Sequence, residues 1–142
     1  MKNYMITYFG ACVGAVASFL GGFTFALKTL IIFMAIDYIT GIIVAAVFKK
    51  STKTNSGSLK SIAGFKGILK KVCILLAVGV ALRIDILVGS SYVHNTVIFA
   101  YLINEAISIV ENFGLMGMYI PEPLKKAIEI LNEKEMKKWK FA

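Results

Sequence analysis

Residues that commonly build catalytic and metal sites are scarce in this chain. Its 142 residues include one histidine and two cysteines, Cys12 and Cys73, which are far apart in the sequence. An ordinary zinc site needs about four such ligands. The motifs HExxH, GxSxG and GxxxxGK(S/T), which mark zinc peptidases, hydrolases and nucleotide-binding loops, are absent from the sequence. We therefore expect a protein that is not an enzyme and that uses no metal or cofactor.

Acidic residues are few as well. The chain has 8 Asp and Glu residues against 16 Lys and Arg residues, and its formal net charge is +8. A basic chain can be a nucleic-acid-binding protein, but here the lysines lie beside apolar blocks and not on a polar domain. Lysines next to a membrane segment attract anionic lipids. The predicted partners are therefore anionic membrane lipids and not nucleic acids.

Apolar sequence is abundant and is concentrated in blocks. Hydrophobic residues make up 58% of the chain and the mean hydropathy is +0.76, whereas soluble domains are roughly 45–50% apolar. A helix needs about 20 mostly apolar residues to cross a bilayer. Four blocks approach that length, at residues 4–27, 29–48, 72–90 and 92–110. We predict an all-α membrane protein with about four transmembrane helices in a domain over residues 1–115.

The lysines predict how these spans are oriented. The segment 49–71 contains no acid and reads as a polar, flexible loop followed by a short interfacial helix. Because short lysine-rich loops stay in the cytoplasm, we expect this loop and the basic tail to be inside, which places both termini inside. If the first block only lies in the interface, three spans remain and the N-terminus is outside. The loop lysines, which we expect to face lipid, are Lys49, Lys50, Lys53, Lys60, Lys66, Lys70 and Lys71.

The tail over residues 116–142 is predicted to form an amphipathic helix. Pro121 and Pro123 suit a helix start, and Leu124, Ile128 and Leu131 follow at helical spacing with charged residues between them. Such a helix lies on a membrane or packs against a partner. A solvated tail with one apolar face is the alternative.

Small residues predict close contacts between helices. They recur at steps of four in the first block, and Gly41 follows Asp37 on one face of the second. Such faces let the backbones of membrane helices approach closely, so we expect helix packing and assembly into a homo-oligomer. The residues of the first-block face are Gly10, Gly14, Ser18 and Gly22.

Several polar residues interrupt the apolar blocks. Ionisable groups inside a membrane are costly, so they face other helices or water. One alternative is pairing within a subunit, for example Arg83 with Asp37 or Glu105. The other is that these groups line a pore or a subunit interface. The candidate polar residues are Asp37, Arg83, Asp85, Asn104, Glu105, Ser108, Glu111 and Asn112.

Four short motifs follow one another along the chain. They are DYITG at 37–41, KGILKK at 66–71, NEAISIVEN at 104–112 and GMYIP at 117–121. In this order they resemble the bacteriophage and toxin-secretion holin family, which includes the small clostridial toxin-release holins. The resemblance covers roughly residues 36–131.

This resemblance implies a lysis protein of the bacterial cytoplasmic membrane. Holins oligomerise and make lesions through which endolysin, or a toxin without a signal peptide, leaves the cell. Asp37, Arg83 and Glu105 would then form a polar interior that switches from a buried to a hydrated state. The alternatives are an antiholin that delays such a holin, a small ion channel or transporter, and a membrane scaffold. A second start at Met5, which would remove Lys2, is a further possibility against a single start at Met1.

Overall fold

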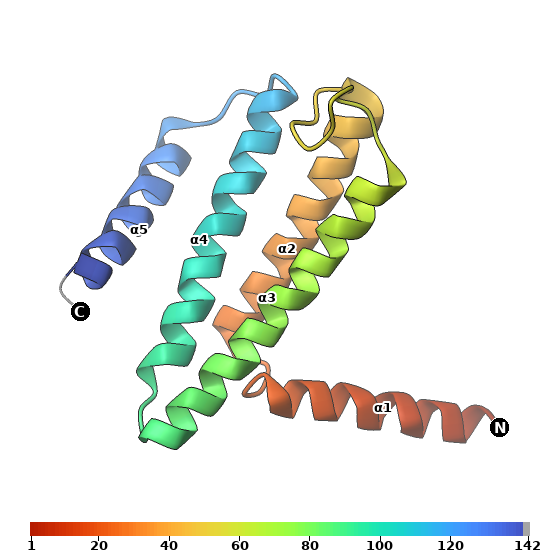
Figure 1. Ribbon diagram of the computed structural model, residues 1–142, viewed down its shortest axis with the longest axis vertical. Helices are drawn as coiled ribbons and strands as arrows, with labels where there is room; N and C mark the ends of the chain where they lie inside the picture. Colours follow the sequence, from red (N-terminus) through yellow and green to blue (C-terminus); the bar gives the residue numbers. More distant parts are fainter. Residues whose placement is uncertain (141–142) are drawn as a thin grey trace.

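The computed structural model describes residues 1–140, which fold into five α-helices and one π-helical turn (Figure 1). Regular structure within these residues is helical throughout, so the predicted all-α class is confirmed. The elements are α1 (Lys2–Phe19), α2 (Phe25–Ile43), the π-helical turn η1 (Val44–Phe48) that continues α2, α3 (Ser61–Val88), α4 (Tyr92–Leu115) and α5 (Glu122–Lys140).

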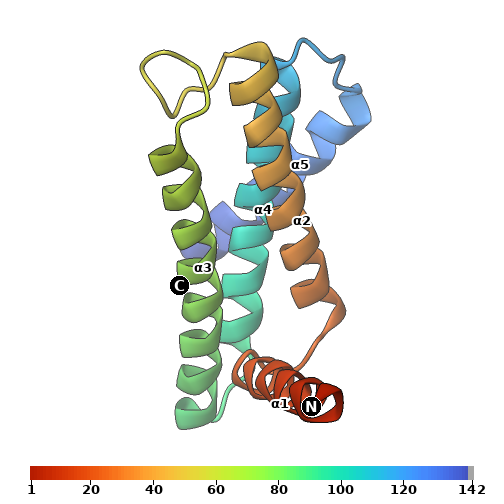
Figure 2. The same ribbon diagram turned by 90° about the vertical axis from the view of Figure 1, so that its right-hand side faces the viewer.

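The helices α2, α3 and α4 form an antiparallel bundle, in which α2 and α4 run in one direction and α3 runs in the other (Figures 1 and 2). Apolar side chains from all three helices meet in its core, where Leu27, Leu30 and Val78 are fully buried. Because lipid is as apolar as these side chains, a membrane bundle is held mainly by close packing and by polar contacts between helices.

Two helical segments are long and apolar enough to cross a membrane. They are Phe25–Phe48, which joins α2 and η1, and Tyr92–Leu115, and each has 24 residues. At about 1.5 Å per residue, each measures about 36 Å and exceeds a hydrocarbon layer of about 30 Å. In α3, Lys66, Lys70, Lys71, Arg83 and Asp85 interrupt the apolar sequence. Two of the four predicted spans are therefore supported by length and hydropathy.

The block that we expected to form the first span, residues 4–27, does not form one helix. The helix α1 ends at Phe19, and α2 begins only at Phe25. Gly21 and Gly22 have φ values of +87° and +84°, a conformation that glycine adopts without steric cost. The Thr24 hydroxyl accepts a hydrogen bond from the Leu27 N–H and caps α2. These turn and cap residues override the continuous apolar composition, and α1 projects sideways from one end of the bundle (Figures 1 and 2).

The basic segment 49–71 also differs from its prediction. Its second half is the start of the continuous 28-residue helix α3 and not a separate interfacial helix. The connection before α3 is a hydrogen-bonded turn, because the Ser51 N–H donates to the Gly57 carbonyl at 3.0 Å. Gly57 has a φ of +68°, and a Cβ there would lie 2.1 Å from the Lys49 carbonyl oxygen. Glycine at this position is therefore required for the turn.

The predicted helix after Pro121 is present as α5, which begins at Glu122 and lies beside α4 (Figure 1). Apolar side chains on it remain exposed, including Leu124, Ile130 and Leu131. Over residues 122–134, Ile128 alone is partly buried and the other residues are exposed. This part of α5 therefore makes little contact with the bundle.

Candidate functional site

Three charged side chains from three helices meet inside the bundle. Lys71 Nζ on α3 lies 2.7 Å from Asp37 Oδ2 on α2 and 2.6 Å from Glu105 Oε2 on α4. The exposed fractions of the three side chains are 17%, 7% and 3% respectively. Two carboxylates therefore share one ammonium group in a largely buried setting. We call Asp37, Lys71 and Glu105 the ion network.

The ion network lies at one level of the bundle. Lys71 is ten residues after the start of α3, and Glu105 is ten residues before the end of α4. Asp37 is eleven residues before the end of η1. Each charge is therefore about 15 Å from the helix termini at the end of the bundle where the 49–60 connection lies (Figure 1). Asp37 and Glu105 are close to the middle of the two candidate spans.

Polar side chains one and two turns beyond Glu105 on α4 complete the environment of Asp37. The Ser108 hydroxyl donates to Asp37 Oδ1. The Asn112 side-chain amide donates to Asp37 Oδ1 at 3.2 Å and to the Thr40 hydroxyl at 2.9 Å. Asn112 is buried. Both oxygens of the Asp37 carboxylate thus have donors, as a buried charge requires.

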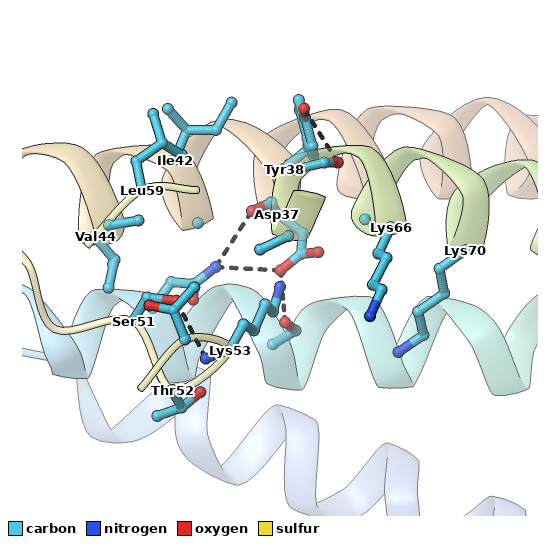
Figure 3. Close-up of a pocket in the computed structure, with 18 of the residues that line it drawn as sticks. Asp37, Tyr38, Ile42, Val44, Ser51, Thr52, Lys53, Leu59, Lys66 and Lys70 are labelled. Carbon is cyan, nitrogen blue, oxygen red and sulfur yellow. Dashed lines mark hydrogen bonds between the residues drawn. The ribbon is translucent and has the colours of Figure 1, made fainter. Parts of the chain in front are cut away.

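A cleft of about 390 Å³ opens above the ion network, between α2, α3 and the 49–60 connection. Asp37, Glu105, Ser108 and Asn112 line its inner end. Figure 3 shows Lys66 and Lys70 pointing into it from α3. Further lining residues include Gly41, Lys53, Lys60 and Asn104.

The predicted lipid-facing lysines therefore divide into two sets. Lys49 and Lys50 are exposed and do not line the cleft. Lys53, Lys60, Lys66 and Lys70 line the cleft, and Lys71 is half-buried between two acids. The prediction was wrong for Lys71, because the continuous helix α3 starts eleven residues before the predicted span at 72–90 and places this side chain against α2 and α4.

The suggested pairing of Arg83 with Asp37 or Glu105 was also wrong. Arg83 is twelve residues beyond Lys71 on α3, a distance of about 18 Å along the helix. Its guanidinium lies 5.7 Å from the centroid of the Phe19 ring. Arg83 therefore contacts the end of α1 and takes no part in the ion network.

Asp85 has a local role at the start of α4. Its carboxylate accepts hydrogen bonds from the N–H groups of Val93 at 3.0 Å and His94 at 2.8 Å. The Ser90 hydroxyl donates to it at 2.7 Å. The first N–H groups of a helix have no hydrogen-bond acceptor within the helix. Asp85 supplies that acceptor for the first turn of α4. Asp85 lies in the last turn of α3 and does not line the cleft.

The remaining predicted residues make few contacts in the described chain. Asn104 and Glu111 are exposed. A Cβ at Gly10 or Gly14 would have no neighbour within 4 Å, and Gly22 lies in the α1–α2 turn. Ser18 is exposed as well. The small-residue face of α1 is thus uncovered by the rest of residues 1–140, and its role in oligomer packing stays a prediction.

Lys71 is the network residue that sequence reasoning missed. The sequence did not clearly indicate its role, because Lys70 and Lys71 end a lysine-rich segment. Such a pair is typical of lysines at a membrane surface. Counting residues from the helix ends would have placed Lys71 level with Asp37 and Glu105. That count needs the true start of α3.

Comparison with known proteins agrees with the expected family. The sequence profile of the bacteriophage holin family matches residues 14–133. An uncharacterized protein of Listeria innocua is 44% identical, over 85% of this chain and 82% of its own length. An uncharacterized protein of Halalkalibacterium halodurans is 36% identical, over 94% and 98%. An uncharacterized 14.9 kDa protein from the nagH 3′ region of Clostridium perfringens is 39% identical, over 81% and 83%.

No solved structure matches the chain. The family assignment therefore depends on the sequence, and the profile covers most of it, from within α1 to within α5. The helices suited to crossing a membrane agree with that assignment. This chain belongs to the bacteriophage holin family.

Proposed function

We propose that this protein is a holin that oligomerises in the bacterial cytoplasmic membrane and forms lesions. Endolysin, or a toxin without a signal peptide, would leave the cell through them. Family membership supports the general role. The observation that supports lesion formation is the ion network, because it holds three charges near the middle of a bundle of membrane helices.

The energetics of the ion network differ between a closed and an open arrangement. In lipid, a charged group is tolerated only when it is paired or hydrated. Asp37, Lys71 and Glu105 satisfy one another only while α2, α3 and α4 remain together. If several subunits separate these helices around water, hydration replaces the pairs at little net cost, since the desolvation penalty of a buried pair is then relieved. The same residues would stabilise the closed bundle and line the lesion.

The outer surface of the bundle supports contact with lipid or with other subunits. Large apolar side chains are exposed on α2 and α3, including Ile32, Ile39, Leu76 and Val80. On α1, Phe9 is 73% exposed. Exposed apolar area of this extent marks an interaction surface. Together with the small residues of α1, it supports the proposed homo-oligomer.

The orientation of α1 bears on the membrane topology. We expected both termini inside, but α1 projects sideways from the end of the bundle opposite the lysine-rich connection (Figure 1). This arrangement favours three spans, α2, α3 and α4, with the N-terminus outside and the tail inside. Labelling of an Asn3→Cys, Cys12→Ser, Cys73→Ser variant in intact cells with a membrane-impermeant thiol reagent tests this. Labelling only after permeabilisation would restore the four-span topology.

Inducible expression in a bacterium, with and without a cytoplasmic muralytic enzyme, tests the function. A holin is expected to collapse the membrane potential in both cases and to lyse the cells only when the enzyme is present. Cells that leak ions but retain the enzyme would indicate a channel. Cells that survive, and that delay lysis by a co-expressed holin, would indicate an antiholin.

Neutral substitutions test the ion network separately. Asp37→Asn and Glu105→Gln are expected to change the time of lysis at equal protein levels. Arg83→Gln is the matched control, because Arg83 is charged, lies on a bundle helix and makes no contact with the network. Unchanged timing and unchanged assembly for both acid variants would refute the role given to the network.

A further inference from the structure

The charge lining the cleft is unbalanced. Lys71 is neutralised by Asp37 and Glu105, at the inner end. Four more lysines line the cleft, and none of them forms a salt bridge with a side chain that the structure describes. These four, which we call the cleft lysines, are Lys53, Lys60, Lys66 and Lys70. The lining of the cleft therefore carries an excess of positive charge. Lys53 Nζ lies toward the inner end, where a Cβ at Gly41 would be 3.9 Å from it, and Lys66 and Lys70 offer ammonium groups that make no salt bridge in the described part of the chain.

Other lining groups suit an anion with oxygen atoms. Ser51 and Thr52 contribute hydroxyl groups from the 49–60 connection. The helix α3 starts at the cleft, and its N-cap residue, Lys60, makes no side-chain cap. The positive end of the helix dipole and the N–H groups of its first turn therefore add to the cationic field. Lys66 and Lys70 are one helical turn apart and point into the same space (Figure 3).

Apolar residues accompany these donors. Ile42 and Leu59 line the cleft, and Leu59 is 50% exposed. Ile62, on the first turn of α3, is 72% exposed. A free inorganic anion gains nothing from contact with apolar surface. The acyl groups of a lipid do, because they are apolar themselves. The volume of about 390 Å³ falls in the range of about 300–1,000 Å³ that is usual for ligand sites.

We propose that the cleft binds the phosphate-bearing head group of an anionic phospholipid from the cytoplasmic leaflet. Basic pockets between membrane helices on the cytoplasmic side bind such head groups. The cleft lysines would hold the phosphate, and Leu59 and Ile62 would contact the apolar part of the lipid. A head group that carries its own ammonium is disfavoured, because four lysines surround the same space. Phosphatidylglycerol is thus preferred over phosphatidylethanolamine.

This site requires membrane insertion but not lesion formation, so it can be tested independently of lysis. The purified full-length protein is placed in neutral detergent micelles that contain phosphatidylglycerol, phosphatidylethanolamine or no lipid. Bound lipid is measured by native mass spectrometry, and the unfolding temperature is measured in parallel. A soluble arm contains glycerol phosphate or inorganic phosphate without lipid.

The decisive variant is Lys66→Gln with Lys70→Gln, and its matched control is Lys49→Gln with Lys50→Gln. Both remove two positive charges from the same segment, but Lys49 and Lys50 do not line the cleft. We expect the cleft variant to bind phosphatidylglycerol on the order of 30-fold more weakly, because it loses two lysine contacts with the head group. The control is expected to bind as the unchanged protein does, and both are expected to keep its helical content and unfolding temperature in lipid-free micelles.

Three results would overturn the proposal. Equal losses in the two variants would show general attraction to the basic segment. Equal binding of phosphatidylethanolamine would show that the anionic head group is not selected. Stabilisation by glycerol phosphate or phosphate alone, as strong as that by phosphatidylglycerol, would show a site for free phosphate.

Discussion

Replacing Lys71 with methionine is expected to destabilise the bundle more than replacing any other lysine. Met keeps much of the length of the side chain but removes the ammonium that both acids contact, at 2.7 Å and 2.6 Å. The side chains of Asp37 and Glu105, which are 7% and 3% exposed, then lose the positive charge that neutralises them. Removing one partner of a buried ion pair costs about 3–5 kcal/mol, which shifts an unfolding equilibrium by more than about a hundredfold.

Arg83→Met is the control for this experiment. Arg83 is on the same helix, but its side chain is exposed and its guanidinium lies over the Phe19 ring, 5.7 Å from the centroid. An exposed cation–π contact contributes about 0.5–1 kcal/mol. The free energy of unfolding is measured for both variants by titration of detergent-solubilised protein with a denaturing detergent. The Lys71 variant is expected to lose several times more stability than the Arg83 variant.

A second substitution separates charge from packing. Adding Glu105→Gln to Lys71→Met removes one of the two uncompensated carboxylates, while Ser108 and Asn112 still donate to Asp37. The double variant is therefore expected to be more stable than Lys71→Met alone. If Lys71→Met were as stable as Arg83→Met, or if Glu105→Gln gave no recovery, the ion network would not hold the three helices together.

Three further substitutions test local features of the fold. Ser108→Ala removes one donor to Asp37 and is expected to cost about 1.5–3 kcal/mol, less than Lys71→Met in the same titration. Asp85→Ala leaves the N–H groups of Val93 and His94 without their acceptor; we expect a loss of about 1–3 kcal/mol, and an unchanged stability would contradict the capping role. Gly57→Ala places a Cβ 2.1 Å from a backbone carbonyl oxygen, so the turn must open and trypsin should cleave faster at Lys53 than in a Ser56→Ala control.

Sequence alone identified most of the ion network by a simple physical argument. Asp37 and Glu105 interrupt apolar blocks, and Ser108 and Asn112 follow Glu105 at helical spacing. A polar stripe on a membrane helix must face other helices or water, and the structure brings all four residues to the inner end of one cleft. The constraint is strong because lipid offers these groups no alternative partner.

Hydropathy could not identify Lys71 as the positive charge that pairs with Asp37 and Glu105. Arg83 lies inside an apolar block and Lys71 lies at the border of one, so composition favoured Arg83. The choice depends on the level of each residue in the bundle, which depends on where α3 begins. That start is set by the turn around Gly57 and by the packing of Gly64 and Gly67 against the Tyr38 ring, contacts between residues far apart in the sequence.

The division of the first apolar block had a local signal that composition concealed. Gly21, Gly22 and Thr24 are residues of a turn and of a helix N-cap, but they lie within an uncharged run that is long enough to cross a membrane. The hydropathy averaged over such a run changes little when it contains two glycines. The turn is visible only in the backbone conformation, where both glycines have positive φ values and the chain changes direction.

The ion network and the cleft form one electrostatic unit because Lys71 belongs to both. The network alone carries two carboxylates and one ammonium, a net negative charge that would be costly in an apolar surrounding. The four cleft lysines offset it and give the lining of the cleft an excess of positive charge. An anionic head group bound there would balance that excess and bridge α3 to the 49–60 connection. Binding of the lipid and the closed state of the bundle should therefore stabilise each other. In cells whose membrane is poor in anionic lipid, lesions should then form sooner after expression begins.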